Sequence, residues 1–422
     1  MAKIKEKAAK PKKTAKQRFK IFLKIILIII IVIAVLAGIV AVVNTVGIKS
    51  NSNFISTVSA VSYDNQLEPT VDENGYYTFV TDNDFNVMQL TDVHIGGGFM
   101  SVRKDNMALN AVASMISEEK PDLVVVTGDI AYPVPFQAGT FNNKNSAMLF
   151  ADLMEQLGVY WCLSFGNHDT EAYSYFTRED IAKVYENKDK YPHCLFQSGD
   201  EAVDGVGNYI VNVKNTAGKI TQSLVMVDSH SYLDNDALGI LWNYDCIHKN
   251  QVEWLNDEIA SLTAQNNGET PKSLAFFHIP LIEMRDAWNE YTKNGFKDTE
   301  NVQYIYGKAG EQDTVVFSSE LNEGFFDSLL KNGSTQGVFC GHDHLNNFSI
   351  MYKGIRLTYG YSIDYLAYSG IYKYGSQRGC TMINISPDGS FDCHQENYYQ
   401  DKYQTVNEKE SVTMDDYYSE AK

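Results

Sequence analysis

Short hydrophobic runs alternate with longer amphipathic segments from Tyr76 onward. The runs "FNVMQL", "DLVVVT" and "VYWCLSF" are separated by helical patterns at residues 107–119 and 146–157. Short apolar runs bounded by turn residues indicate buried strands, and a period near 3.6 residues indicates helices. The pattern therefore predicts a βαβαβ order whose strands are largely buried. Further strands are expected at 209–213, 223–228, 273–277, 337–340, 355–359 and 380–385.

The N-terminal region follows a different pattern, because residues 25–43 form a run of nineteen residues without a charge. As a helix, this run is long enough to cross the ~30 Å hydrocarbon core of a membrane. The apolar core of a cleaved signal peptide is usually shorter, at ~7–15 residues. We therefore predict an uncleaved transmembrane signal anchor, although the small residues Ala37, Gly38 and Ala41 leave cleavage open.

The charge of the chain divides at this apolar run. Residues 1–24 carry nine lysines, Arg18 and one acid, Glu6, so this basic tail has a net charge of +9. The formal net charge of the whole chain is −18, which leaves about −27 for the rest. Basic flanks favour the cytoplasmic side, so we expect a single-pass protein of the cell membrane with an extracytoplasmic domain. An acidic body repels phosphate backbones, and no nucleic-acid partner is expected.

Composition also suggests how the chain after the span is divided. Residues 44–74 are rich in Ser, Thr, Asn and Asp and keep no sustained period, which predicts a stalk or linker. A globular domain is expected at 75–391 and a polar C-terminal tail at 392–422. Within the domain, residues 284–320 lack a clean period and are expected to form a loop or cap. Six cysteines include no C-x-x-C pair, so the sequence assigns no disulfide.

Polar side chains follow five of the predicted strands, at the point where each strand ends. In "GVFCGHDHLNNF", His342 and His344 are two residues apart, so an extended segment points both imidazoles the same way. Ligands gather at the carboxyl ends of strands in α/β sheets, so the five sets are expected to meet. Each residue alone is typical of a turn or a polar loop. The five sets are Asp92 and His94, Gly128 and Asp129, Gly166 to Asp169, His278, and Gly341 to His344.

The blocks "DVH", "GD", "GNHD", the histidine of "FHIP" and "GHDH" occur in this order and without substitution. Through them the sequence closely resembles the calcineurin-like metallophosphoesterases, and it looks most like their purple-acid-phosphatase-like branch. The resemblance spans roughly residues 86–385. It implies an α/β fold, namely a four-layered α/β/β/α sandwich of two mixed sheets, here preceded by a single transmembrane helix.

The resemblance also implies a dinuclear metal centre. A shell of oxygen and imidazole ligands suits two divalent or mixed-valence ions such as Mn, Fe or Zn, and a hydroxide held between them attacks phosphorus in line. His168 is implied to contact the phosphoryl group or to protonate the leaving oxygen, with Asp169 as its orienting partner. The implied ligands are Asp92, His94, Asp129 and His344 for one ion, and Asp129, Asn167, His278 and His342 for the other, with Asp129 bridging.

Tyr132 departs from the pattern of the true purple acid phosphatases. The segment "GDIAY" places Tyr132 at the offset of their iron-binding tyrosine, but those enzymes lack the histidine that this chain keeps as His94. Tyr132 is therefore expected to pack against the site or to line its wall.

The sequence thus predicts a membrane-anchored phosphoesterase that hydrolyses phosphomonoesters. A phosphodiesterase acting on nucleotides or lipid head groups is the alternative, because the same metal core serves both reactions. A noncatalytic metal-binding surface protein is the second alternative, although the blocks keep every implied ligand and His168. Metal identity and oligomeric state stay open.

Overall fold

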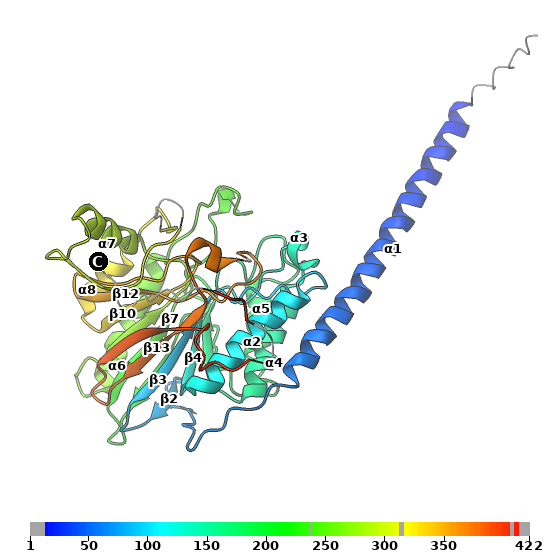
Figure 1. Ribbon diagram of the computed structural model, residues 1–422. Coiled ribbons are helices and arrows are strands. Elements are labelled where there is room, and N and C mark those ends of the chain that lie inside the picture. The colour runs from blue at the N-terminus through cyan, green and yellow to red at the C-terminus, as the bar shows by residue number, and fades with distance from the viewer. Residues whose placement is uncertain (1–12, 237, 312–315, 369, 406–408, 413–422) are drawn as a thin grey trace, which may run out of the picture.

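The structure is a computed structural model that describes residues 13–236, 238–311, 316–368, 370–405 and 409–412 (Figure 1). Its smaller sheet has five strands in the order β14-β13-β3-β4-β5. The strands β3, β4 and β5 are parallel, and β13 runs antiparallel to β3, so this sheet is mixed. The bounds are β3 (Phe85–Leu90), β4 (Leu123–Thr127), β5 (Trp161–Ser164), β13 (Gly379–Ile385) and β14 (Phe391–Asn397).

The larger sheet has nine strands in the order β1-β2-β6-β7-β8-β10-β12-β11-β9. Its central strands β7, β8, β10 and β12 are parallel, whereas β6 pairs antiparallel with β7, and β11 pairs antiparallel with both β12 and β9. The bounds are β1 (Thr70–Val71), β2 (Tyr77–Val80), β6 (Tyr209–Lys214), β7 (Ile220–Met226), β8 (Lys272–Phe276), β9 (Val302–Tyr306), β10 (Thr335–Cys340), β11 (Ser349–Tyr352) and β12 (Ile355–Tyr359).

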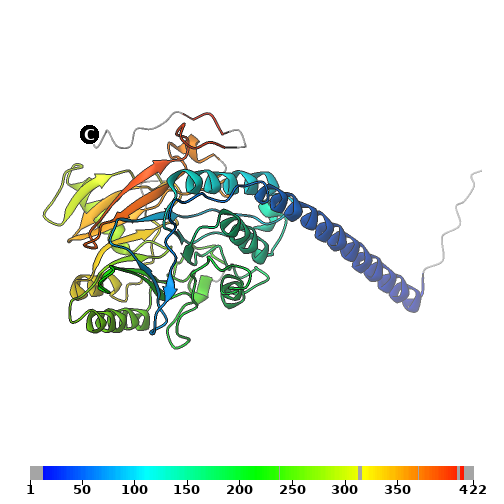
Figure 2. The ribbon, with the colours of Figure 1, turned by 90° about the horizontal axis from the view of Figure 1, so that it is seen from below.

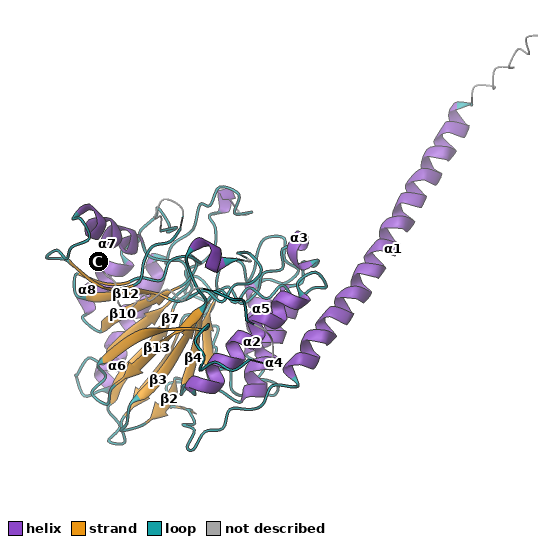
Figure 3. Ribbon diagram, viewed as in Figure 1, coloured by secondary structure: helices purple, strands orange, loops and turns teal. Residues whose placement is uncertain are grey.

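The two sheets pack face to face, and helices cover their outer faces (Figure 3). Alternation along the strands produces these layers, because successive side chains point to opposite faces. Phe276 and Phe339 stack at 5.1 Å in the core between the sheets, whereas Ala275 and Val338 belong to the core under the outer helices of the larger sheet. The predicted four-layered sandwich of two mixed sheets is therefore confirmed.

Two groups of helices form the outer layers. The smaller sheet is covered by α2 (Val102–Glu119), α4 (Asn143–Leu157) and α5 (Arg178–Tyr185), which contribute to its core. The larger sheet is covered by α6 (Lys249–Gln265), α7 (Ile282–Lys293) and α8 (Phe325–Asn332). Short helices lie in loops: α3 (Pro135–Ala138), η1 (Asp234–Asp236) and η3 (Ile371–Tyr374). The segment 284–320, expected as a loop, instead contains most of α7 and all of β9.

The first helix, α1 (Ala15–Ile55), contains the predicted span and continues twelve residues beyond it. Its apolar half stands clear of the domain (Figure 2). Its last turns pack on α2 and α4, where Gly47 and Asn51 are buried. The expected stalk at 44–74 therefore differs from the structure: its first part is helix, and its remainder lies along the domain, where Tyr63 Oη donates to the Pro121 carbonyl.

The two ends of the expected domain also differ in detail from the structure. The region 392–422 was expected to be a polar tail, but most of β14 lies in it, and Tyr398 and Tyr403 are buried. Residues 413–422 lie outside the described part of the chain. All six cysteines are free thiols.

Candidate metal centre

The predicted site residues follow the carboxyl ends of β3, β4, β5, β8 and β10, and the structure brings them together. Four of them have left-handed backbone conformations, with φ of 51° at Asp92, 53° at His94, 54° at Asp129 and 76° at His342. This region is costly for residues other than glycine, and such strain concentrates at functional sites. The chain therefore turns sharply after these strands, and the turns direct the side chains to a common point.

Glycines at the same turns allow the strand ends to approach one another closely. A Cβ atom at Gly341 would lie 1.8 Å from Thr91 Oγ1, and a Cβ atom at Gly166 would lie 2.1 Å from Asp129 Oδ1. Both distances are far inside van der Waals contact, so only glycine fits. This explains why a glycine precedes Asn167 and His342 in the sequence.

One group of possible ligands contains Asp92, His94 and His344, which are all buried. His344 Nε2 lies 3.4 Å from Asp92 Oδ1, and His94 Nε2 lies 4.0 Å from the same oxygen. A second group contains Asp129, His278 and His342. His278 Nε2 lies 3.1 Å from Asn167 Oδ1 and 3.3 Å from His342 Nδ1.

Asp129 lies between the two groups. Its Oδ2 atom is 3.2 Å from His94 Nε2 and 3.1 Å from His278 Nε2, so one carboxylate oxygen contacts an imidazole from each group. Burial opposes ionisation of Asp129, but the neighbouring His278 and His168 outweigh it and hold the pKa of this carboxyl well below its usual range. Asp129 is therefore a buried carboxylate shared by both groups.

The donor set fits a pair of divalent cations. Seven side chains offer carboxylate oxygens, one amide oxygen and imidazole nitrogens without a thiolate, which is the mixture that Mn, Fe and Zn accept. Ring nitrogens of His278 and His342 face each other at 3.3 Å, so both imidazoles point to the same place. Burial and the adjacent His278 keep the pKa of His342 well below its usual value, so its lone pair is available to a metal.

His168 stands beside the seven residues and is partly exposed to solvent, with 25% of its side chain accessible. Its Nδ1 atom lies 2.6 Å from Glu171 Oε1, and its ring is edge-on to His94 with centroids 5.4 Å apart. The expected pairing of His168 with Asp169 does not occur. Asp169 instead accepts backbone N–H groups of Asp129, Ala131 and Gly166 at 2.8–3.0 Å.

Asp169 therefore ties the loop after β4 to the loop after β5. Its carboxyl is buried, and burial together with the charge of Asp129 raises its pKa to about 6. Glu171, the actual partner of His168, was missed by sequence reasoning. Its position three residues after His168 was the one available signal, because the turn that joins them was not predicted.

Asp364 is a second residue that sequence reasoning missed. Its Oδ2 atom lies 3.2 Å from His344 Nδ1, and its Oδ1 atom lies 3.6 Å from His94 Nδ1. Burial opposes its ionisation, but His94 and His344 hold the pKa of Asp364 below its usual range. The buried Arg378 fixes the same loop by donating to the carbonyls of Ile363 and Asp364. The segment "YSIDYLAYSG" gives no local signal for this role.

Tyr132 forms a wall of the site. Its ring stacks on His94 with centroids 4.6 Å apart and an interplanar angle of 10°, and it meets His168 edge-on. Burial is the main cause that raises the pKa of Tyr132 far above neutrality. A neutral phenol stacked on a ring face fits the expected packing role.

A third group, His230, Asp245 and His248, also brings possible metal ligands together. However, His248 already pairs through Nδ1 with Asp204 at 2.8 Å and through Nε2 with Asp245 at 3.2 Å. The rings of His230 and His248 stack at 4.2 Å and 21°, so their in-plane lone pairs do not converge. We therefore interpret His248 as a histidine paired with two carboxylates, and not as part of a metal site.

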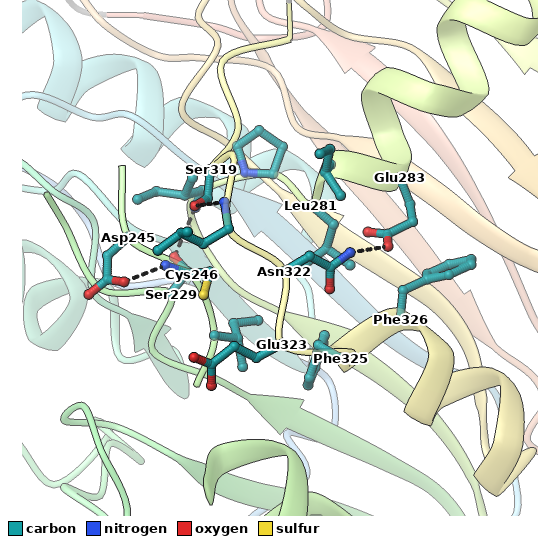
Figure 4. Close-up of a pocket in the computed structure, with 15 residues that line it drawn as sticks. Ser229, Asp245, Cys246, Leu281, Glu283, Ser319, Asn322, Glu323, Phe325 and Phe326 are labelled. Atoms are coloured by element: carbon teal, nitrogen blue, oxygen red, sulfur yellow. Dashed lines mark hydrogen bonds between the residues drawn. The ribbon is translucent and has the colours of Figure 1, made fainter. Parts of the chain in front are cut away.

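A small cavity lies behind His278, lined by Ser229, Cys246 and Leu281 among others (Figure 4). Its volume of about 30 Å³ has room for about one water molecule. Ser229 Oγ accepts the N–H of Ile279 at 2.9 Å, and Asn322 Nδ2 donates to Glu283 Oε1 across the cavity. The cavity is too small for a substrate and supports the His278 strand end from behind.

Comparison with known proteins identifies relatives of the whole domain. The family model described as "Calcineurin-like phosphoesterase" matches residues 85–346. The chain is 29% identical over 320 residues to "Probable inactive purple acid phosphatase 14" of Arabidopsis thaliana, covering 69% of this chain and 74% of that protein. It is 29% identical over 333 residues to "Probable inactive purple acid phosphatase 29" of the same plant, covering 73% and 78%.

More distant similarities extend to a fungal protein and a solved structure. The chain is 27% identical over 286 residues to "Phosphatase DCR2" of Saccharomyces cerevisiae, covering 63% of this chain and 45% of that protein. The crystal structure of a dimetal phosphatase from Danio rerio superposes with a TM-score of 0.49 and 12% identity, covering 75% of this chain and 97% of that chain.

Proposed function

The chain belongs to the calcineurin-like phosphoesterase family, and we propose that it is a membrane-anchored, metal-dependent hydrolase of phosphomonoesters. Asp92, His94, Asp129 and His344 would hold one divalent cation, and Asp129, Asn167, His278 and His342 would hold the other. The observation that carries the proposal is the contact of one Asp129 oxygen with both His94 and His278. A shared carboxylate offsets the repulsion between two adjacent cations.

When bound, the two cations would acidify a water molecule for attack on phosphorus and neutralise charge on the phosphoryl oxygens. The remaining roles belong to this chain. His168 reaches solvent at the edge of the site and is positioned to contact the phosphoryl group or to protonate the leaving oxygen. Glu171 would hold the His168 ring by its Nδ1 atom, which leaves Nε2 for the substrate.

The anchoring part of the proposal rests on α1. This helix has a mean hydropathy of 3.6 over eighteen residues, and none of that stretch is buried. A soluble helix with such a surface would expose a large apolar area to water, which is unfavourable. We propose that residues 25–43 span the cell membrane, that the basic tail stays in the cytoplasm and that the domain lies outside.

One assay of the full chain in detergent distinguishes the proposed phosphomonoesterase from a phosphodiesterase and from a noncatalytic protein. The names of two plant relatives describe them as probably inactive, and a noncatalytic metal-binding protein is therefore tested directly. Purified protein is loaded with Mn, Fe, Zn or Mg and given nitrophenyl phosphate and bis-nitrophenyl phosphate, with Asp129→Ala as background control. We expect metal-dependent turnover that is faster on the monoester. Faster turnover of the diester would favour a phosphodiesterase, and full metal binding without turnover would overturn the enzymatic proposal.

A further inference from the structure

The end of the apolar span is fastened directly to the catalytic face of the domain. Asn44 follows the last residue of the span, Val43. Its side chain donates to the Gly139 carbonyl at 3.1 Å and accepts the N–H of Phe99 at 2.8 Å. One turn later, a Cβ atom at Gly47 would lie 2.9 Å from Val102 Cγ2. The glycine therefore allows α1 to pack closely against Val102 of α2.

A buried polar contact fixes the next turn of α1. Asn51 Nδ2 donates to Asp105 Oδ2 at 3.1 Å. Asp105 also accepts the backbone N–H groups of Gly96 at 2.8 Å and Gly97 at 3.1 Å. The same carboxylate therefore joins α1 to the loop that leaves β3, at the two glycines that follow His94 and Ile95. The helix is held to the domain at several points rather than by a flexible tether.

These attachment points determine where the membrane surface lies. Phe99 and Gly139 belong to the loops after β3 and β4, whose first residues are the candidate ligands Asp92, His94 and Asp129. If the hydrocarbon core begins at Val43, the rim of the metal centre lies at the level of the membrane interface. Figure 1 shows α1 leaving the domain on the side of α3.

The same face carries apolar side chains that the domain leaves in water. Near α1, Phe136 on α3 is 89% exposed, and Met100 is 53% exposed. On the other side of the metal centre, a protruding loop after β7 presents an apolar tip, which we define as Leu238, Ile240, Leu241 and Trp242 and which is 57–73% exposed. Monomeric proteins rarely leave such clusters uncovered unless they bind something.

Residues on either side of this apolar tip contact the candidate metal ligands. Tyr244, two residues after Trp242, stands edge-on to His342 with ring centroids 4.5 Å apart. Tyr232 Oη, before the tip, accepts from Asn167 Nδ2 at 2.8 Å. The apolar tip is therefore joined at both ends to residues that contact candidate ligands.

We infer that the covering partner is the bilayer in which α1 is anchored, and that the substrate is a phosphate monoester carried by a lipid in that bilayer. Phe136 and the apolar tip would enter the interface on opposite sides of the metal centre, where aromatic residues are favoured. Because the body of the protein carries about −27, insertion of apolar side chains would drive the contact, and attraction to anionic lipids is not required. The inference rests on the proposed anchor and phosphomonoesterase activity.

Tryptophan fluorescence tests the orientation without any assay of activity. The full chain is reconstituted in phosphatidylcholine vesicles whose acyl chains are brominated, which quenches tryptophans inside the bilayer. Trp161 and Trp288 are buried in the protein and Trp242 is 63% exposed. We expect the brominated lipid to quench one component of the tryptophan emission. This component should be absent from Trp242→Phe and present in the control Trp254→Phe, on α6. Quenching of that component by aqueous iodide instead, with none by brominated lipid, would overturn the orientation and favour a soluble protein partner.

The substrate class is tested in the same vesicles. Wild type and a Leu241→Asp, Trp242→Asp double variant are given phosphatidate in the bilayer or nitrophenyl phosphate in solution. We expect the double variant to lose about tenfold or more on phosphatidate, since two interfacial contacts are removed, and to keep its rate on the soluble ester. If wild type cleaves the soluble ester but not phosphatidate, the lipid substrate is wrong and the proposed function stands. If it cleaves neither ester, the proposed function fails, while the quenching result still decides the orientation.

Discussion

The Nδ1 atom of His168 lies 2.6 Å from Glu171 Oε1, at the edge of the candidate metal centre. Burial disfavours the charged form of His168, but Asp129 and Glu171 outweigh it and raise the pKa of the imidazole. The remaining nitrogen of a ring held in this way is free for a proton transfer at the solvent side. His168 is therefore the residue of the blocks whose proposed role is chemical rather than ligation.

Replacing His168 by Ala should leave the metal content near that of wild type and slow turnover by roughly 10²–10⁴, the usual range for a positioned general acid or base. If His168 protonates the leaving oxygen, the loss should be much larger on alkyl phosphates than on nitrophenyl phosphate, because nitrophenolate departs without a proton. Steady-state rates on both esters and metal analysis measure this, with the exposed His394→Ala as control. Equal losses would favour simple electrostatic contact, and lost metal would make His168 a ligand.

Replacing Glu171 by Gln should lower the pKa of His168 while keeping the shape of the side chain. A general acid works only when protonated, and its raised pKa extends activity to higher pH. Removal of the Glu171 charge should therefore move the alkaline limb of kcat/KM to lower pH, with little change on the acidic side. The pH profile of Glu118→Gln, an exposed change on α2, serves as reference. An unmoved alkaline limb would assign that limb to another group.

Replacing Asp129 by Ala should remove the carboxylate that contacts both groups of ligands. We expect bound metal to fall from about two ions per chain and turnover to be abolished, because one shared ligand holds both ions. Asp92→Asn should lose less metal, since an amide oxygen still coordinates weakly. Elemental analysis of the purified variants after dialysis measures both effects. Full metal content with normal activity in Asp129→Ala would refute the assignment.

Much of the candidate site follows from local sequence, and the reason is topological. Asp92, Asp129, Asn167, His278 and His342 each come just after a buried strand, and parallel strands bring their carboxyl ends to one edge. The hydrophobic runs that predict these strands therefore also predict where the polar residues after them meet. The layers follow from the same runs, because alternate side chains face the other sheet or a helix.

The residues that sequence reasoning missed depend on how distant loops return to the site. Asp364 lies in the loop after β12, twenty residues beyond His344. It returns to His344 because Arg378 holds the backbone of this loop through the Asp364 carbonyl. The last turns of α1 are similar. Composition predicts the span at 25–43, but residues 44–55 stay helical because Gly47 and Asn51 find partners on the domain. Such contacts have no periodic signal in the chain.

Replacing Asp364 by Asn should weaken metal binding without disturbing the ligands themselves. Asp364 contacts His344 Nδ1 at 3.2 Å, and such a carboxylate orients the ring and increases its basicity. Loss of the charge should reduce metal affinity by roughly 10- to 100-fold. Competition with a chelator measures this affinity, and the exposed Asp257→Asn on α6 is the matched control. Unchanged affinity would limit Asp364 to holding the loop.

The topology of the chain gives the last prediction. Residues 1–24 carry a net charge of +9 directly before the apolar run, and basic segments of this kind remain on the cytoplasmic side. Protease added to intact cells should therefore digest the domain beyond the span and leave the basic tail protected. Antibodies against a tag at each end of the chain report both fragments. Because α1 is fastened to the loops after β3 and β4, cleavage near residues 44–55 should be slow compared with cleavage in the exposed turn at 199–202. A protected domain with a digested tail would reverse the orientation, and release of the intact domain by alkaline carbonate would show that the anchor is cleaved.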